Sequence, residues 1–271
     1  MKHYAVIGSP VQQSLSPIMH QWVFDSLKIN AEYKKIKLEE NELPGIIQKM
    51  RSGELDGLNI TIPFKESIVQ YLDKINPRVQ SIGAANCIIN SDSMIIGNNT
   101  DWYGFSMMLK INDINLTDKE VIVLGAGGSA KSILYALRKM GVEKILLINR
   151  SIEKAKALQD NYVIANSMDD TENIIKTDSI IINTTSVGME SSKSPIDLGL
   201  IHKNQVLIDI IYSPMETCIL KFGRKIGAFT VNGLDMFIHQ GLASLDLWFG
   251  SSISTQVNLP KLKTYLETKL C

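Results

Sequence analysis

Cysteine is scarce in this sequence, and neither sign of charge is in excess. The three cysteines, Cys87, Cys218 and Cys271, are far apart, which excludes a disulfide framework or a zinc knuckle and predicts a reducing, cytoplasmic setting. Lysine plus arginine and aspartate plus glutamate are equal at 28 each, so nothing indicates nucleic acid or an anionic membrane as a partner. The four histidines fit no metal-ligand spacing, and we expect no metal.

Long apolar runs are missing as well. No run approaches the roughly 18 residues that a membrane-spanning helix needs. The chain passes from Met1 into an expected strand and a turn at Gly8 too early for a signal peptide. With 271 residues, 45% of them hydrophobic, the chain is long enough for two domains with buried cores.

The most informative motif is a glycine-rich turn near the middle of the chain. An apolar run, Val121–Leu124, precedes it, and a helical pattern, Ile133–Leu137, follows it. Strand, tight turn and helix are the context that a G-x-G-x-x-A dinucleotide fingerprint requires. One glycine allows the turn, the next lets a pyrophosphate approach the backbone, and the alanine lets the helix pack against the strand. The predicted cofactor-binding residues here are Gly125, Ala126, Gly127, Gly128, Ser129 and Ala130.

The residues after the next expected strand indicate which dinucleotide binds. Dinucleotide folds that take NAD usually have Asp or Glu there, which accepts hydrogen bonds from the ribose 2′-OH. This chain instead has Asn149, Arg150 and Ser151, with Lys154 one turn further on. Because a guanidinium pairs well with a 2′-phosphate, we predict NADP as the cofactor. The alternative is that Arg150 is only a solvated strand end.

Strands and helices alternate along both halves of the chain, which predicts an α/β fold with mostly parallel sheets. We expect an N-terminal substrate-binding and catalytic domain of residues 1–104 plus 238–271, a Rossmann-type NADP-binding domain of residues 105–237, and a cleft between them. A helix over 101–112 would link the halves. Among the local expectations are a helix over 17–27 with Ser16 as its N-cap, and helices over 40–51 and 65–72.

Four short segments of the first half place polar residues where expected strands end or helices begin. Ser14 and Ser16 offer hydroxyls at a helix start, a good place for a carboxylate. Ligands of open α/β sheets bind outside the carboxyl ends of the strands, so Lys65 and Asp101 can converge there beside a nicotinamide. The segments are Ser14–Pro17, Asn59–Lys65, Gly83–Asn86 and Gly97–Asp101.

At these residues the chain resembles the shikimate dehydrogenase family. The family's N-terminal signature is similar to Ser14–Pro17, and its N-[VI]-T-x-P-x-K, G-A-x-N and N-T-D segments resemble residues 59–65, 83–86 and 99–101. Its third cofactor loop, its D-x-x-Y-x-P-x-x-T motif and its last motif resemble residues 183–189, 209–217 and 233–240. Seven motifs in family order, spread over the whole chain, make coincidence very improbable.

The resemblance implies the reversible, NADP-dependent interconversion of 3-dehydroshikimate and shikimate, a step towards chorismate and the aromatic amino acids. Positioned proton transfer accelerates a reaction by about 10² to 10⁴. We assign the proton transfer to Lys65, and to Asp101 the orientation of the substrate hydroxyl and of Lys65. The sequence leaves open which of the two residues carries the proton. By resemblance, the substrate carboxylate would bind Ser14 and Ser16 with Tyr212 nearby. The residues that would bind the ring hydroxyls, or orient neighbouring side chains, are Asn59, Thr61, Asn86 and Gln240. The residues that would line the nicotinamide end of the cofactor are Thr185, Ile210, Gly233 and Met236.

Several alternatives remain at this point. The chain could be a quinate/shikimate dehydrogenase that uses NAD, or a non-catalytic ligand sensor on the same fold. Lys65 and Asp101 could form only a surface ion pair, and Tyr212 and Gln240 could be structural. Cys87 stands where the family usually has threonine, and we expect a reactive thiol near the substrate. The sequence is compatible with a monomer or a homodimer.

Overall fold

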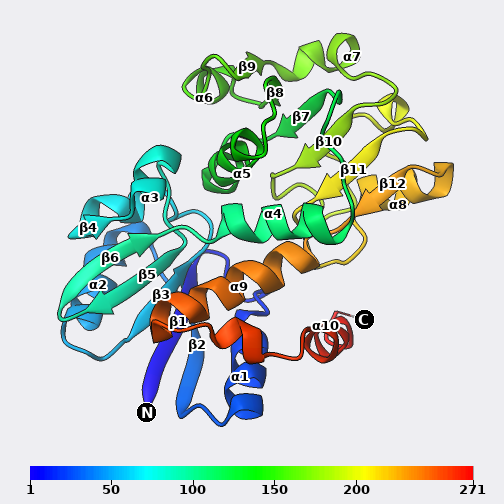
Figure 1. The fold of residues 1–271 in the computed structure, drawn as a ribbon. Coiled ribbons are helices and arrows are strands. Elements are labelled where there is room, and N and C mark those ends of the chain that lie inside the picture. Colours follow the sequence, from blue (N-terminus) through cyan, green and yellow to red (C-terminus); the bar gives the residue numbers. More distant parts are fainter. Residues whose placement is uncertain (271) are drawn as a thin grey trace. The chain divides into compact units, whose positions relative to one another are not determined.

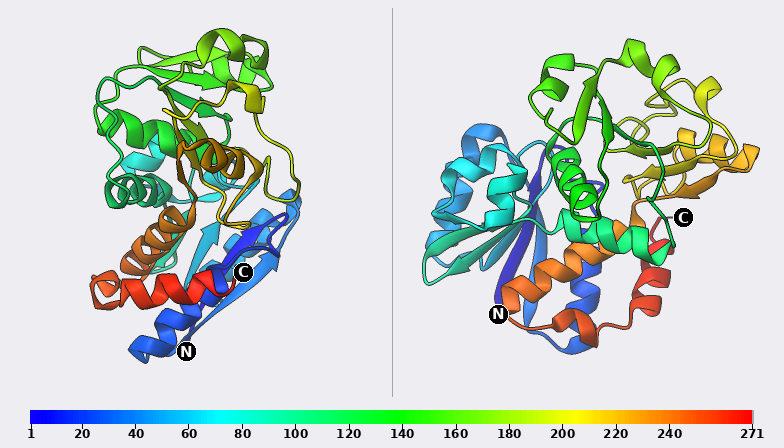
Figure 2. Two further views of the ribbon diagram at one scale, coloured as in Figure 1. Left: turned by 90° about the vertical axis from the view of Figure 1, so that its right-hand side faces the viewer. Right: turned by 45° about the horizontal axis from the view of Figure 1, so that its top comes forward.

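The computed structural model describes residues 1–270, which form two compact units (Figure 1). The first unit consists of Met1–Gly104 together with the chain from Ile238 onward, and the second of Phe105–Phe237. Two helices span the boundaries between these segments: α4 (Asp101–Ile111) and α9 (Leu234–Phe249). Each unit contains one six-stranded sheet, which can be followed in Figures 1 and 2.

The first unit is built on a mixed sheet in which five strands run one way. The strand order is β2-β1-β3-β5-β6-β4, and β5 alone is antiparallel to its two neighbours. Besides its parts of α4 and α9, the unit contains β1 (Lys2–Gly8), α1 (Ser16–Leu27), β2 (Ala31–Lys37), α2 (Leu43–Arg51), β3 (Gly57–Ile60), β4 (Lys74–Ile75), α3 (Pro77–Ile82), β5 (Cys87–Ser91), β6 (Met94–Asn98) and α10 (Leu259–Glu267).

The core of the first unit depends on the returning C-terminal segment. Trp248 stacks on Tyr4 with ring centroids 4.5 Å apart, and its indole N–H donates to the Ile88 carbonyl at 3.0 Å. A Cβ built on Gly57 would lie 2.4 Å from the same indole, so only glycine leaves room for the ring there. The α9 segment is therefore an integral part of the first hydrophobic core.

The second unit is an all-parallel sheet with the strand order of dinucleotide-binding folds. Across the sheet the strands lie in the order β9-β8-β7-β10-β11-β12. If β7 to β12 are numbered 1 to 6 along the chain, this is the order 3-2-1-4-5-6. Its elements are β7 (Val121–Leu124), α5 (Gly128–Lys139), β8 (Ile145–Ile148), α6 (Ile152–Lys156), β9 (Val163–Asn166), α7 (Thr171–Ile174), β10 (Ile180–Asn183), β11 (Val206–Asp209), α8 (Cys218–Ile226) and β12 (Phe229–Val231).

Both faces of this second sheet are covered, as its continuous apolar strands require. Ile122, Ile181 and Leu207 pack in one cluster with Ile219 and Leu220 of α8. Their neighbours along each strand point to the opposite face and are buried as well, except Val206, which is partly exposed. The predicted α/β class with mostly parallel sheets and a Rossmann-type unit is confirmed.

Some local predictions were wrong. The predicted helix over 65–72 is a 3-10 helix at Ser67–Tyr71, and the first turn of the predicted helix over 40–51 is a separate 3-10 helix at Glu40–Glu42. Ser16 does not cap α1: Leu15 occupies the N-cap position, and the Ser16 N–H donates to the Ser14 hydroxyl instead, at 3.2 Å. This turn moves the helix start one residue earlier than predicted.

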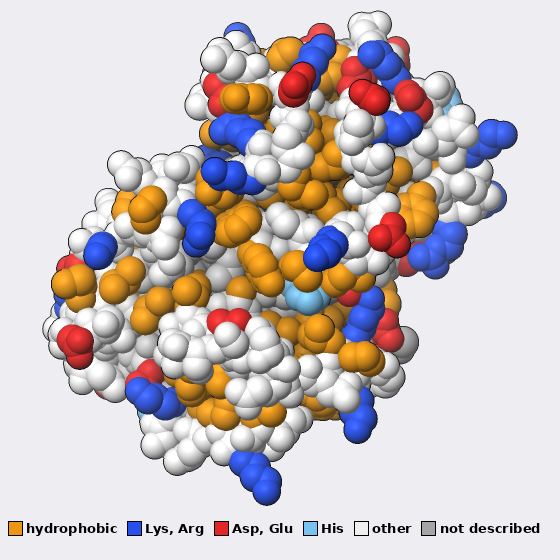
Figure 3. Space-filling model, viewed as in Figure 1, with side chains coloured by type: hydrophobic (Ala, Val, Ile, Leu, Met, Phe, Trp, Pro, Cys, Tyr) orange, Lys and Arg blue, Asp and Glu red, His pale blue; other side chains and the backbone are white. Residues whose placement is uncertain are grey.

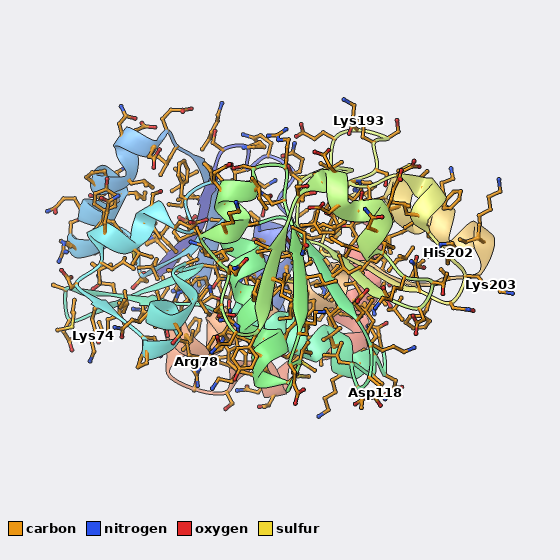
Figure 4. The ribbon with its side chains drawn as sticks, turned by 90° about the horizontal axis from the view of Figure 1, so that it is seen from above. Lys74, Arg78, Asp118, Lys193, His202 and Lys203 are labelled. Atoms are coloured by element: carbon orange, nitrogen blue, oxygen red, sulfur yellow. The ribbon has the colours of Figure 1, made fainter. Side chains whose placement is uncertain are left out.

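The surface carries charges of both signs. On the face that Figure 3 shows, Lys and Arg side chains are interspersed with Asp and Glu side chains. Figure 4 shows Lys74 and Arg78 of the first unit, and Lys193, His202 and Lys203 of the second, at the periphery of their units. None of the helices described is long and apolar enough to cross a bilayer, and residues 1–270 contain no group of three or more His, Cys, Asp or Glu side chains placed to hold a metal ion.

Candidate active site

Lys65 and Asp101 form a nearly buried ion pair in the first unit. The Lys65 ammonium donates to Asp101 Oδ2 at 2.6 Å, and the side chains are 14% and 5% exposed. The Lys65 carbonyl accepts from the Ala85 N–H at 2.8 Å, which ties the lysine to the 83–86 segment. Asp101 opens α4, where its N–H donates to Asn99 Oδ1 at 3.1 Å. This burial rules out an ordinary solvated surface pair.

Asn86 holds the other oxygen of the same carboxylate. Its amide nitrogen donates to Asp101 Oδ1 at 2.8 Å and to Thr100 Oγ1 at 2.9 Å, and lies 3.3 Å from Gln240 Oε1. Its amide oxygen accepts from the Thr100 N–H at 2.6 Å. Because both oxygens of Asp101 have donors, the carboxylate is fixed in place, with Gln240 of α9 brought to the same group.

Asn59 contacts this group through Asn86 and is held by two residues that the sequence analysis did not identify, Ser244 and Tyr33. Its amide nitrogen donates to Ser244 Oγ at 2.9 Å and to the Asn86 carbonyl at 3.1 Å, and its oxygen accepts from the Tyr33 hydroxyl at 2.8 Å. Ser244 Oγ also lies 3.3 Å from Thr100 Oγ1. One signal could have identified Ser244: it is the only polar residue of the short stretch 241–245 of α9.

Ser14 and Ser16 form a second polar group at the start of α1. The Ser14 hydroxyl donates to Ser16 Oγ at 3.1 Å. The Ser16 carbonyl accepts from Nδ1 of His20 at 2.7 Å, and His20 stacks on Tyr33 with ring centroids 4.2 Å apart. Burial lowers the pKa of His20 from 6.5 to about 4, so the ring is neutral at physiological pH. Thr61 follows β3, and its N–H donates to the Ile7 carbonyl of β1.

Cys87 is not the reactive thiol that the sequence suggested. It lies on β5 with no exposed surface, and burial raises the pKa of its thiol from 9.0 to about 12. Because the thiolate is the reactive form, a buried thiol of this kind is inert.

The glycine turn of the second unit has the geometry that a pyrophosphate site needs. Gly125 has a positive φ of 106°, and a Cβ there would lie 2.7 Å from Thr184 Oγ1. A Cβ on Gly127 would meet open space, and Gly127 is the N-cap of α5 with no side-chain cap. Gly128, Ser129 and Ala130 form the first turn of α5, with Ala126 just before it and Ala130 fully buried. The helix N-terminus is therefore open to an anion.

Arg150 follows β8 and is exposed, as is Lys154. The Asn149 side chain donates to the Ser151 carbonyl at 2.8 Å, and the Ser151 hydroxyl donates to Glu153 at 3.0 Å. These bonds shape the turn into α6. Because Arg150 is exposed, its guanidinium is accessible to a phosphate.

Two further loops leave the carboxyl ends of β10 and β11. Thr185 is the second residue after β10 and Ile210 the first after β11, and both are partly exposed. A Cβ on Gly233 would lie 2.0 Å from the Ile210 carbonyl oxygen, so only glycine fits there, and Met236 follows in the first turn of α9. Tyr212 belongs to this unit, where its ring packs on Phe237 at 4.4 Å. The structure thus joins Lys65, Asp101, Asn86 and Gln240 in one group, while Tyr212 belongs to the other unit.

This combination defines a class of protein: a two-unit, dinucleotide-dependent oxidoreductase with a lysine–aspartate pair outside its Rossmann-type unit. Two family models match the chain, the shikimate dehydrogenase substrate binding domain over residues 6–88 and shikimate/quinate 5-dehydrogenase over residues 106–212. A shikimate dehydrogenase (NADP(+)) of Bacillus anthracis is 36% identical over 275 residues, which cover 98% of each chain. The chain therefore belongs to the shikimate dehydrogenase family.

Solved structures agree with this assignment. Shikimate dehydrogenase 1 of Peptoclostridium difficile is 31% identical with a TM-score of 0.86, covering 100% of this chain and 98% of that one. Shikimate 5-dehydrogenase of Thermus thermophilus, in complex with NADP(H) and shikimate, is 32% identical with a TM-score of 0.82 and covers 92% and 94%. The predicted family resemblance is confirmed over nearly the whole chain.

Proposed function

We propose that this protein catalyses the reversible, NADPH-dependent reduction of 3-dehydroshikimate to shikimate. The observation that carries the proposal is the buried group of Lys65, Asp101 and Asn86 in a chain of this family. The first unit would bind the substrate and the second NADP(H). We further propose a cytoplasmic enzyme, monomeric or homodimeric, whose partners are its substrate and cofactor.

The second unit fits NADP(H) by its shape and charge. The open space at Gly127 leaves the backbone of the turn accessible to a pyrophosphate, and the uncapped start of α5 offers N–H donors. Arg150 and Lys154 would pair with the 2′-phosphate. Thr185, Ile210, Gly233 and Met236 would line the nicotinamide end. When bound, NADPH supplies the hydride that reduces the ketone.

The first unit would supply the proton. Hydride addition to a ketone places negative charge on its oxygen, and a proton donor beside that oxygen lowers the barrier. The Lys65 ammonium would transfer a proton from Nζ to this oxygen during reduction and accept it back during oxidation. Asp101, fixed by Asn86, would orient the lysine and the reacting hydroxyl. Proximity adds to this effect because the pair is already in place before substrate binds.

The substrate would be held around this pair. Ser14 and Ser16 would bind its carboxylate, with Tyr212 nearby, while Thr61 and Gln240 would bind ring hydroxyls. Both amide hydrogens of Asn59 are already donated, to Ser244 and Asn86. We therefore assign Asn59 to orienting Asn86 rather than to binding substrate directly.

Initial rates test this function directly. Shikimate and quinate are each offered with NADP and with NAD, and formation of the reduced nicotinamide is followed by absorbance. Fast turnover only with shikimate and NADP supports the proposal. Efficient turnover of quinate with NAD would instead make this a quinate/shikimate dehydrogenase. A folded protein that binds shikimate without turnover would be a ligand sensor.

A further inference from the structure

The second unit contains a buried carboxylate to which the proposed reaction gives no role. Asp209 is the last residue of β11 and has no exposed surface. Its hydrogen-bond partners within residues 1–270 are all neutral: the Ile211 N–H at 3.0 Å, Asn183 Nδ2 at 3.1 Å and Thr217 Oγ1 at 2.8 Å. Burying a carboxylate without a cation is costly, and burial raises the pKa of Asp209 from 3.8 to about 6.

One of the three donors ends strand β10, and the other two lie after β11. Asn183 ends β10, and its own oxygen accepts from the N–H and the hydroxyl of Thr185, at 3.0 and 2.7 Å. The Thr185 hydroxyl in turn accepts from the Val187 N–H at 3.1 Å. Through Asn183, the carboxylate therefore fixes the course of the 184–187 loop.

The other two donors fix the loop after β11. Ile211 lies at its start, directly before Tyr212, and Thr217 lies at its end, as the N-cap residue of α8. An N-cap threonine ordinarily accepts a hydrogen bond from the helix. Thr217 makes no such cap and donates its hydroxyl to Asp209 instead. The spacing of aspartate and threonine in the 209–217 motif is explained by this contact.

The loops held in this way carry residues assigned above to ligands. Thr185 and Ile210 stand at the proposed nicotinamide end, and Tyr212 at the proposed carboxylate end. A Cβ on Gly125 would lie 2.7 Å from Thr184 Oγ1 and 3.0 Å from Thr185 Cγ2, so the first loop also packs on the glycine turn. A shift of either loop would therefore change the surface offered to the cofactor.

We propose that Asp209 is a positioning residue, which acts through Asn183 and Thr217 to hold both loops in the arrangement that binds NADP(H). It touches neither cofactor nor substrate in this scheme. The inference rests on the proposed function because the loops matter only if the cofactor binds at the carboxyl ends of these strands.

A matched pair of substitutions at Thr217 tests the proposal. Thr217→Val keeps the shape and removes the hydroxyl, whereas Thr217→Ser keeps the hydroxyl. Losing one hydrogen bond to a charged group should raise the dissociation constant of NADPH about tenfold in Thr217→Val. Thr217→Ser should stay close to the wild-type value. NADPH binding is measured by its fluorescence, with the KM of NADP and kcat determined alongside.

A control variant separates positioning from loss of stability. Leu220→Val shortens a buried side chain of the same helix outside the network and should lower the melting temperature without changing NADPH affinity. The proposal is overturned if Thr217→Val binds NADPH within twofold of wild type, or if Leu220→Val weakens binding equally. A wild-type protein that binds NADPH but does not oxidise shikimate would overturn the proposed function alone, and the ratio of dissociation constants would still decide the role of Asp209.

Discussion

Each unit has a buried aspartate next to its proposed ligand site, Asp101 in the first unit and Asp209 in the second. The two carboxylates are stabilised in different ways. Asp101 faces the Lys65 ammonium at 2.6 Å and accepts from Asn86. Within the described residues 1–270, the groups that donate to Asp209 are all neutral. A buried ion pair holds a proton donor and its partner together, whereas a carboxylate with neutral donors holds backbone, amide and hydroxyl groups in place. We take the first arrangement as suited to proton transfer and the second to shaping loops.

The largest expected effect lies at the ion pair. Lys65→Ala should reduce kcat by at least about a hundredfold because it removes the proton donor, while the protein stays folded and binds shikimate. Steady-state kinetics with NADP, together with circular dichroism and shikimate titration, would check this.

Lys74→Ala is the matched control, since Lys74 is an exposed lysine of the same unit. Its kcat should equal that of wild type. Near-normal turnover in Lys65→Ala would contradict the proton-transfer role of Lys65. The difference between Asp101 and Asp209 would then not correspond to a difference between proton transfer and loop positioning.

A smaller effect is expected at the edge of the second unit. Arg150→Ala should raise the KM of NADP between about 10- and 100-fold, the range for loss of one hydrogen bond to a charged group. The KM of NAD should change little because NAD has no 2′-phosphate. Lys193→Ala, which removes another exposed cation of this unit, should affect neither. Equal weakening of both cofactors by Arg150→Ala would refute the 2′-phosphate contact.

Acid should change the free energy of unfolding of the two units in opposite directions, because each unit buries a titratable group of a different kind. The pKa of Asp209 is raised from 3.8 to about 6, so its stabilising contribution is complete below about pH 4 and is lost as the pH rises through 6. The loss is about 3 kcal/mol in the free energy of unfolding. Asp209→Asn should remove this dependence, as denaturation followed between pH 4 and 7 would show.

His20 in the first unit should change stability with pH in the opposite direction. Burial lowers its pKa from 6.5 to about 4, so its contribution is present above about pH 6.5 and is lost as the pH falls through 4. This loss is also about 3 kcal/mol. In calorimetry, His20→Phe should make the first unit less sensitive to acid while Asp209→Asn acts on the second. Two variants with the same slope against pH would contradict the assignment.

Much of the fold could be predicted from the sequence because it depends on local pattern. The buried face of Leu43, Ile46, Ile47 and Met50 has helical spacing and lies within the helix predicted over 40–51. The two-residue strand β4 and the six-residue helix α3 are too short to leave a periodic signal. β4 exists only because it pairs with β6, which no local pattern reveals.

The site was predictable to the extent that its residues lie in motifs. Lys65, Asp101 and Asn86 do, and the structure places them in contact. Ser244 and Tyr33 lie in no motif and reach Asn59 only through folding, from 185 and 26 residues away in sequence. Asp209 and Thr217 lie in a matched motif, yet their mutual contact depends on how the loop between them closes.

The first unit is assembled from two stretches of chain separated by the whole of Phe105–Phe237. During synthesis, the contacts of Asn59 with Ser244 and of Asn86 with Gln240 can therefore form only after the C-terminal segment has been made. At about 5–20 residues per second this delay is on the order of ten seconds. The second unit, which is continuous in sequence, has left the ribosome completely before the first unit has. The order of maturation on the ribosome is thus the reverse of the order in the gene, and the nascent N-terminal half must stay soluble in the meantime.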